Sequence, residues 1–250
     1  MPSIFVTGGT GKFGRKIIEH FLEKGWDVLF TSTSEKKIHQ IKLDFQANER
    51  LKGFLVDFRE TDAIPSLLDS LLNNYGPINH LVNNARSMES LKVGENGLTS
   101  RQHFQEEFLI DVIVPYELSM ALATAQEFDL KTIVNIGSQY GVVAPNPALY
   151  SHKWEKSPIQ YGVSKAALAH LTKELAVRLA SKNIRVNSIA YGGVEGRVTD
   201  EFKGLYANLC PLGRMLTEEE IAGPIDYLVT ESSSGMTGQT LSVDGGWTLW

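Results

Sequence analysis

Short apolar runs alternate along the chain with longer segments in which apolar residues recur at helical spacing. The runs contain mainly aliphatic and aromatic side chains with few polar residues between them, which is typical of strands buried on both faces of a parallel sheet. Strands are predicted at residues 4–6, 28–30, 53–57, 78–83, 132–136, 184–189 and 239–243.

The segments between these strands predict helices that cover the sheet. The first helix follows a glycine-rich turn and ends at Gly25, and the others are expected at about 35–49, 61–75, 99–128, 159–181 and 217–229. We expect the long helix at 99–128 to bend at Pro115, because proline lacks a helical N–H. Regular alternation predicts a mostly parallel sheet with helices on both faces, whose ligands bind beyond the carboxyl ends of the strands.

The first turn carries Gly8, Gly9, Gly11 and Gly14 between a strand and a helix. The N-terminus of that helix would present free backbone N–H groups and a partial positive charge, which together favour a pyrophosphate. The alternative is that these glycines serve only a tight turn. Their place between the first strand and the first helix of an alternating chain favours a dinucleotide site.

Composition limits the class of protein. The chain has 250 residues, of which 42% are hydrophobic, and neither repeats nor a linker, so we expect one domain over residues 1–250. The formal net charge of −5 argues against a nucleic-acid or membrane partner. A single cysteine, scattered histidines and the lack of a leader or long apolar run predict a cytoplasmic protein without a metal site.

Tyr161 and Lys165 form the only Tyr-x-x-x-Lys pair in the sequence and fall in a predicted helix. Residues four apart lie on one helix face, so the ammonium of Lys165 would stand beside the phenol of Tyr161. A cation at that distance favours phenolate over phenol and makes the tyrosine a usable general acid or base. A surface tyrosine beside a solvated lysine is the alternative on spacing alone.

Polar residues also follow the predicted strands. Asn83, Asn84 and Ala85 end the fourth strand, and Ser138 follows the fifth. An isolated serine after a strand is usually a turn former. Since the Tyr161 helix comes next in the chain, we expect the Ser138 hydroxyl to reach the same cleft and hold a substrate oxygen.

Taken together, these motifs resemble the short-chain dehydrogenase/reductase family over essentially the whole chain. The matching segments are Thr7–Gly14, Asp57, Asn83–Ala85, Ser138, Tyr161 with Lys165, Ile184–Ser188 and the C-terminal run MTGQTLSVDGG. The resemblance implies a Rossmann-type doubly wound α/β fold, with a seven-stranded parallel sheet between two helical layers. It also implies NAD(P)-dependent hydride transfer that interconverts a carbonyl and a hydroxyl on a small molecule.

The resemblance also assigns roles to residues. It implies that Tyr161 is the acid/base, that Lys165 activates it and binds the nicotinamide ribose, and that Ser138 orients the reacting oxygen. Asp111 joins this catalytic group because it falls where the family carries an asparagine in the fourth helix. The predicted cofactor-binding residues are Gly8, Gly11, Lys12, Phe13, Gly14, Thr31, Ser32, Asp57, Phe58, Asn83, Ala85, Tyr161, Lys165 and Val194.

The sequence departs from the family pattern at four places. Lys12 stands where the classical form has glycine, and could place a cation near the phosphates. Asp111 adds a carboxylate that could alter the charge balance around Lys165. Arg86 replaces the glycine that usually follows Asn-Asn-Ala, and Tyr191-Gly192-Gly193-Val194 stands where the family has Pro-Gly.

The end of the second strand indicates the form of the cofactor. NAD specificity usually needs a carboxylate there to bind the ribose 2′-hydroxyl. Here the strand runs into Thr31 and Ser32, and the first acid is Glu35. Hydroxyls together with Lys12 and Lys36 suit a 2′-phosphate, so we expect NADP, with NAD as the alternative.

The substrate is less well defined by the sequence. The 22 residues between Ser138 and Tyr161 include a loop at 145–158 that contains Tyr150, His152, Lys153, Trp154 and Lys156. Aromatic and cationic side chains suit a sugar or phosphorylated substrate, and the segment resembles family members of surface-glycan and flagellin-modification pathways. The alternatives are a reductase of acyl or simple carbonyl compounds and a non-catalytic dinucleotide-binding sensor or scaffold.

Two helices predict an oligomer. The segments at 99–128 and 159–181 carry apolar residues on more than one face, so a second face needs a partner. Two-fold symmetry is the default for homo-oligomers, and the family resemblance points to a homotetramer, with a dimer as the fallback. We expect the tail Trp247–Trp250 to be buried at a subunit contact.

Overall fold

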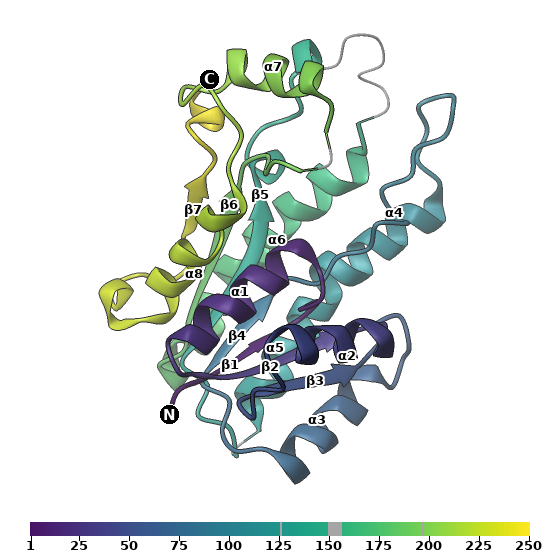
Figure 1. Ribbon diagram of the computed structural model, residues 1–250. Coiled ribbons are helices and arrows are strands. Elements are labelled where there is room, and N and C mark those ends of the chain that lie inside the picture. The colour runs from purple at the N-terminus through teal and green to yellow at the C-terminus, as the bar shows by residue number, and fades with distance from the viewer. Residues whose placement is uncertain (126, 150–156, 197) are drawn as a thin grey trace.

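The computed structural model describes residues 1–125, 127–149, 157–196 and 198–250. A seven-stranded parallel sheet lies at its centre, with the strand order β3-β2-β1-β4-β5-β6-β7. The strands are β1 (Ser3–Val6), β2 (Asp27–Ser32), β3 (Leu51–Leu55), β4 (His80–Asn83), β5 (Thr132–Ser138), β6 (Arg185–Tyr191) and β7 (Thr240–Val243) (Figure 1). The expected doubly wound fold is confirmed.

Helices pack on both faces of this sheet. They are α1 (Lys12–Glu23), α2 (Glu35–Asp44), α3 (Ala63–Asn74), α4 (Arg101–Phe108), α5 (Val114–Thr124), α6 (Ile159–Leu179), α7 (Asp200–Leu209) and α8 (Ala222–Val229) (Figure 1). Side chains alternate across a strand, so Ile4 and Val6 join a core with α1, α2 and α8, while Phe5 joins a second core with α3, α5 and α6. The strand order reverses between β1 and β4, where such folds bind their ligands.

The long helix expected at 99–128 is divided. Between α4 and α5 the chain makes a π-helical turn over Leu109–Ile113, directly before Pro115. Proline has no N–H to donate to the carbonyl four residues earlier, that of Asp111, which explains why the regular α-helical pattern fails here. The helix expected as one element is therefore interrupted by a π-helical turn that contains Asp111.

Other helix boundaries also differ from the expectations. The helix expected at 35–49 ends at Asp44, and the one at 217–229 is a 3-10 turn over Glu218–Glu220 followed by α8. Helix α7 was not expected, although Thr199 caps it by accepting a hydrogen bond from Phe202 and Asp200 and Glu201 occupy its first turn. Those residues are a recognisable helix start.

Helix α7 forms a small third core with the C-terminal end of the chain. Tyr206, Cys210, Met215 and Trp247 are buried together with Leu149. In Figure 1, α7 and the C-terminus lie next to each other beyond β5, β6 and β7. Among the described residues, no helix is long and apolar enough to cross a membrane.

Candidate active site

The Ser138 turn packs directly against helix α6. Ser138 ends β5, and its Oγ accepts a hydrogen bond from the backbone N–H of Tyr140, 3.2 Å away. A Cβ atom at Gly141 would lie only 2.8 Å from the backbone carbonyl of Lys165, and one at Gly162 would lie 3.0 Å from the carbonyl oxygen of Tyr140. Two glycines thus allow the close approach that brings Ser138 to the N-terminal part of α6.

Tyr161 and Lys165 stand one turn apart on α6, as their spacing predicts. The Nζ atom of Lys165 lies 5.7 Å from the centre of the Tyr161 ring. Lys165 is buried, and its ammonium donates a hydrogen bond of 3.0 Å to the carbonyl oxygen of Ile136 in β5. The strand therefore fixes the lysine beside the tyrosine.

Asp111 reaches the same lysine from the π-helical turn. Its Oδ1 is 3.0 Å from Nζ of Lys165, and its Oδ2 accepts a 2.9 Å hydrogen bond from the hydroxyl of Ser164. The Asp111 side chain is 1% exposed. This carboxylate neutralises part of the lysine's charge through its side chain.

Arg86 brings a second cation to Tyr161. Its guanidinium carbon lies 5.0 Å from the centre of the Tyr161 ring, within the range of a cation–π contact. Arg86 is exposed and follows Ala85, whose backbone N–H donates to the Thr7 hydroxyl. The departure after Asn-Asn-Ala thus places a guanidinium at the predicted acid/base.

Glu107 is a further buried carboxylate behind this group. It lies one helical turn before Asp111 and is 1% exposed. Burial and the negative charge of Asp111 raise the pKa of Glu107 to about 7, against the smaller opposing effects of the Ser90 hydrogen bond, Lys165 and Arg86. The sequence interpretation missed this residue because a glutamate in a helix normally faces solvent.

The glycine turn forms a close-packed cradle. A Cβ atom at Gly14 would lie 2.5 Å from the carbonyl oxygen of Gly8, so α1 rests directly on the turn. Gly8 has a φ of +68° and approaches Ala85. No side chain caps the start of α1 at Gly11, and the first N–H groups of a helix lack partners within it. The backbone at Lys12, Phe13 and Gly14 is therefore free of a competing capping side chain.

Three of the predicted cofactor residues make contacts within the protein at this turn. The ammonium of Lys12 donates to the carbonyl of Glu195 and lies 3.1 Å from Oε1 of Glu218. Thr31 Oγ1 accepts from the backbone N–H of Gly8 at 3.1 Å, and the hydroxyls of Ser32 and Thr10 are 2.8 Å apart. Lys12 is thus directed towards two glutamates.

Four more of the predicted cofactor residues lie at or after the carboxyl ends of the strands. Arg59 hydrogen bonds to Asp57 and holds the pKa of that carboxyl below its usual value. Phe58 is buried in the core with α3 and α5, Asn83 donates to Asn135 at 2.8 Å, and Val194 bridges to Leu216. Phe58 and Asn83 are therefore packed in the protein interior.

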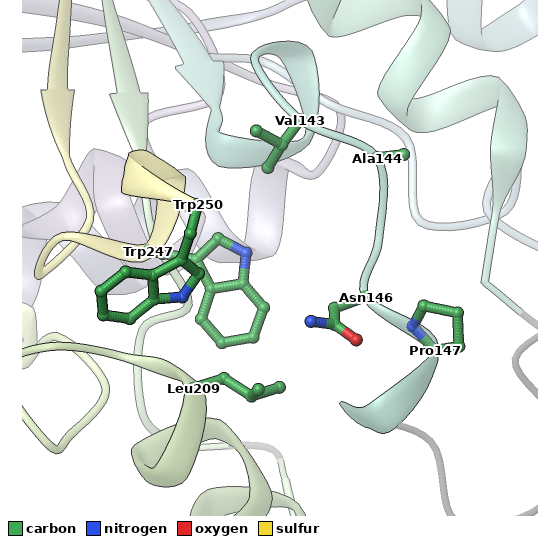
Figure 2. A pocket seen from close by; sticks show the side chains of 7 residues that line it. All are labelled: Val143, Ala144, Asn146, Pro147, Leu209, Trp247 and Trp250. Atoms are coloured by element: carbon green, nitrogen blue, oxygen red, sulfur yellow. The ribbon is translucent and has the colours of Figure 1, made fainter.

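A pocket lies between the chain that follows Ser138, the end of α7 and the C-terminal tail. It is lined by Val143, Ala144, Asn146, Pro147, Leu209, Trp247 and Trp250. Figure 2 shows the two tryptophans on one side, with Asn146 and Pro147 facing them across the gap.

Tyr206 links this pocket to the Ser138 turn. The rings of Tyr206 and Trp247 stack at 4.3 Å, and the Tyr206 hydroxyl donates to Gln139, the residue after Ser138, at 2.8 Å. Burial raises the pKa of Tyr206 to about 12, so the phenol stays protonated. Helix α7, which carries Tyr206 and Leu209, is the part of this pocket that the sequence interpretation missed.

The substrate loop expected at 145–158 is described only in part. Its predicted aromatic and cationic residues, Tyr150, His152, Lys153, Trp154 and Lys156, lie outside the described residues. The described start of the loop forms a 3-10 turn over Pro147–Leu149, in which Leu149 is buried against Tyr206 and Trp247.

Comparison with known proteins places this site in a family. Residues 11–248 match a family model described as Enoyl-(Acyl carrier protein) reductase. The post-translational flagellin modification protein A of Campylobacter coli is 28% identical over 98% of both chains. The 3-oxoacyl-[acyl-carrier-protein] reductase of Haemophilus influenzae is 32% identical over 96% of both chains.

Solved structures agree with the observed fold. A short chain dehydrogenase from Leptospira borgpetersenii with bound NAD+ has a TM-score of 0.86 at 27% identity, covering 99% of this chain and 92% of that one. The structure of ElxO with NADP bound also has a TM-score of 0.86, at 25% identity, covering 100% of this chain and 99% of that one.

Proposed function

The chain belongs to the short-chain dehydrogenase/reductase family of oxidoreductases, and on this premise we propose that it interconverts a carbonyl and a hydroxyl group with Tyr161 as general acid/base. The observation that carries the proposal is the packing of the Ser138 turn against Tyr161 and Lys165 at the carboxyl end of β5. These groups could meet one substrate oxygen.

Each side chain has a defined part in this chemistry. In reduction the Tyr161 phenol donates its proton to the substrate oxygen, and in oxidation the phenolate removes the hydroxyl proton. The Ser138 hydroxyl holds the same oxygen, and Lys165, fixed by Ile136, stabilises negative charge on Tyr161. The nicotinamide, when bound, supplies or accepts the hydride. General acid/base catalysis of this kind contributes about 10²–10⁴-fold to the rate.

The cofactor that fits the glycine cradle is a dinucleotide. The uncapped start of α1 offers N–H groups to a diphosphate, and the close contacts of Gly8 and Gly14 leave no room for side chains in the turn. We propose NADP because β2 ends in Thr31 and Ser32 without a carboxylate. Lys36, which is exposed in the first turn of α2, is the available cation, since Lys12 is held by Glu195 and Glu218.

We propose a sugar or sugar derivative as the substrate. The flagellin-modification relative supports this choice. Arg86 adds a guanidinium at Tyr161 that suits an anionic substituent such as a phosphate, and Asn146 and the two tryptophans of the pocket suit a hydroxylated ring. One wall of the pocket, from Val143 to Pro147, belongs to the segment of chain that follows Ser138.

An acyl substrate is the second candidate. The family description and the Haemophilus relative are both acyl-carrier-protein reductases by name. Val143, Ala144 and Leu209 in the pocket would suit an aliphatic chain. A substrate series decides between the two candidates, because a sugar site and an acyl site require opposite polarity.

The test is a spectrophotometric assay of the purified chain with NADPH or NADH. Ketosugars, their phosphate esters and a 3-oxoacyl thioester would be compared at equal concentration, with Tyr161→Phe as the control. Turnover of the ketosugars in preference to the thioester supports the sugar proposal. Preferred turnover of the thioester would replace it with the acyl function, and equal rates in Tyr161→Phe would reject the proposed chemistry.

We also propose a cytoplasmic homotetramer, with a dimer as the fallback. Helices α5 and α6 and the π-helical turn leave apolar side chains in contact with solvent, namely Ile113, Tyr116, Ile159, Val163 and Val177. Leu249 and Trp250 are each 75% exposed, which supports a subunit contact for the end of the tail. Trp247 differs from the expectation because it is buried against Tyr206 of its own chain.

A further inference from the structure

Glu107 occupies an unusual position for a carboxylate. It lies in the last turn of α4, immediately before the π-helical turn that carries Asp111. Its side chain faces the protein interior, and only 1% of the residue's surface is exposed to solvent. Burying a carboxylate without a cation in direct contact is costly unless the group is protonated or hydrogen bonded.

The hydrogen bonds of Glu107 satisfy only one of its oxygens. Its Oε2 accepts from the hydroxyl of Ser90, whereas Oε1 is buried and has no hydrogen-bond partner among the described residues. Burying an oxygen without a hydrogen-bond partner costs more free energy for a charged carboxylate than for a neutral carboxylic acid, so this environment favours the protonated form. Retaining such a residue without a role would cost stability.

A hydrogen-bond network connects the surroundings of Glu107 to the start of α6. The carbonyl of Ser90 accepts a 2.6 Å bond from the side-chain amide of Gln160, which is fully buried and directly precedes Tyr161. The Gln160 oxygen in turn accepts from the hydroxyl of Thr99 at 2.7 Å. Ser90, which donates to Glu107, is therefore also hydrogen bonded to the helical turn that carries Tyr161.

Charged groups reach Glu107 from three elements. Asp111 on the following turn disfavours its ionisation, while Lys165 on α6 and Arg86 after β4 favour it. Lys165 is already paired with Asp111, so the ionised form of Glu107 would add a second negative charge that acts on this lysine. The pKa of about 7 means that this charge changes within the physiological range.

We propose that Glu107 is a positioning residue that holds a proton in the buried layer behind Asp111 and Lys165, and that this proton controls how strongly Lys165 stabilises the Tyr161 phenolate. The inference rests on the proposed role of Tyr161. With the proton present, Lys165 faces one negative charge. When the proton leaves to solvent, Lys165 faces two, and its support of negative charge on Tyr161 weakens.

The first test compares pH–rate profiles for hydroxyl oxidation, which requires the phenolate. The probe is the alcohol formed from whichever ketosugar or 3-oxoacyl thioester is turned over. Glu107→Gln fixes the neutral form, so the rate of this variant relative to wild type should rise about three- to tenfold between about pH 6 and pH 8. Glu106→Gln is the matched control, since Glu106 is the neighbouring residue and contacts Ser87 and Arg59.

The proposal would be overturned if the rate of Glu107→Gln relative to wild type did not change with pH. It would also be overturned if the relative rate of Glu106→Gln changed by the same factor. Loss of activity in Tyr161→Phe alone would support the proposed chemistry without supporting a role for Glu107. A purely structural role for Glu107 would scale the rate by one factor at every pH.

The second test uses the protein without substrate or cofactor. Infrared difference spectra across a pH titration should show a protonated carboxylic acid that ionises near the Glu107 pKa of about 7. Glu107→Gln should lack this band, and Glu106→Gln should keep it. If wild type shows no such band, Glu107 does not hold this proton, whatever substrate the enzyme takes.

Discussion

The ammonium of Lys165 lies 3.0 Å from the carboxylate of Asp111, and both side chains are shielded from solvent. The lysine that should activate Tyr161 therefore carries its own counter-ion. Arg86 supplies a second positive charge, with its guanidinium carbon 5.0 Å from the centre of the Tyr161 ring. The acid/base thus depends on a balance of charges drawn from α6, the π-helical turn and the end of β4.

Replacing Asp111 by Asn should test this balance. The variant Asp111→Asn removes the negative charge while keeping a side-chain oxygen for Lys165. The pH at which alcohol oxidation reaches half of its maximum rate should fall by about one unit. Asp129→Asn is a suitable control because Asp129 is exposed and pairs with Lys131. An unchanged profile would show that Asp111 does not moderate Lys165.

Replacing Tyr161 by Phe should remove the proton donor and keep the ring beside Arg86. Turnover should fall by about 10²–10⁴-fold, the usual contribution of a general acid. Binding of NADPH, followed by fluorescence, should persist because the glycine cradle is unaffected. More than a tenth of wild-type turnover in Tyr161→Phe would assign the proton transfer to another group.

Cofactor preference should depend on the end of β2. The unmodified protein is expected to bind NADPH more tightly than NADH. Ser32→Asp should reverse this order, since a carboxylate repels a 2′-phosphate and accepts hydrogen bonds from a 2′-hydroxyl. Fluorescence titration of both proteins with both cofactors measures the effect. Tighter binding of NADH by the unmodified protein would establish NAD as the cofactor.

Glu107 should make the stability of the protein depend on pH. Its pKa is raised in the folded state to about 7 from an ordinary value of 4.5, so the folded state binds more protons than the unfolded state between these values. The wild type should therefore lose stability as the pH rises through this window. The Tm of Glu107→Gln relative to wild type should increase by several degrees over the same range.

The exposed end of the tail should contribute to assembly. Leu249 and Trp250 are both 75% exposed in a single chain of 27.7 kDa. Light scattering should give a tetramer or a dimer, and replacing both residues by serine should weaken the assembly. Glu231→Gln, at a surface away from the tail, is the control. A monomer at micromolar concentration for the wild type would reject both the assembly and the role of the tail.

The sequence predicted the sheet because the information for it is local. Apolar runs such as Ile4–Val6, the glycines that follow, and the helical spacing after them lie within a few residues of one another, and each predicts its own element. The pairing of Tyr161 with Lys165 was predictable for the same reason, since the two residues are one turn apart in the same helix. Helix α7 was missed although its signals are also local: Thr199 marks its start, and Phe202, Leu205, Tyr206 and Leu209 recur at helical spacing.

The sequence by itself determined the alternation of strands and helices, the glycine turn and the positions of Ser138, Tyr161 and Lys165. The tertiary structure decided the charges around them. Asp111 is 54 residues from Lys165 in the sequence. Glu195, whose backbone carbonyl accepts a hydrogen bond from Lys12, is 183 residues from that lysine. Burial of Glu107 likewise depends on segments that are distant in sequence. Such contacts follow from how helices pack on the sheet, and no local periodicity encodes them.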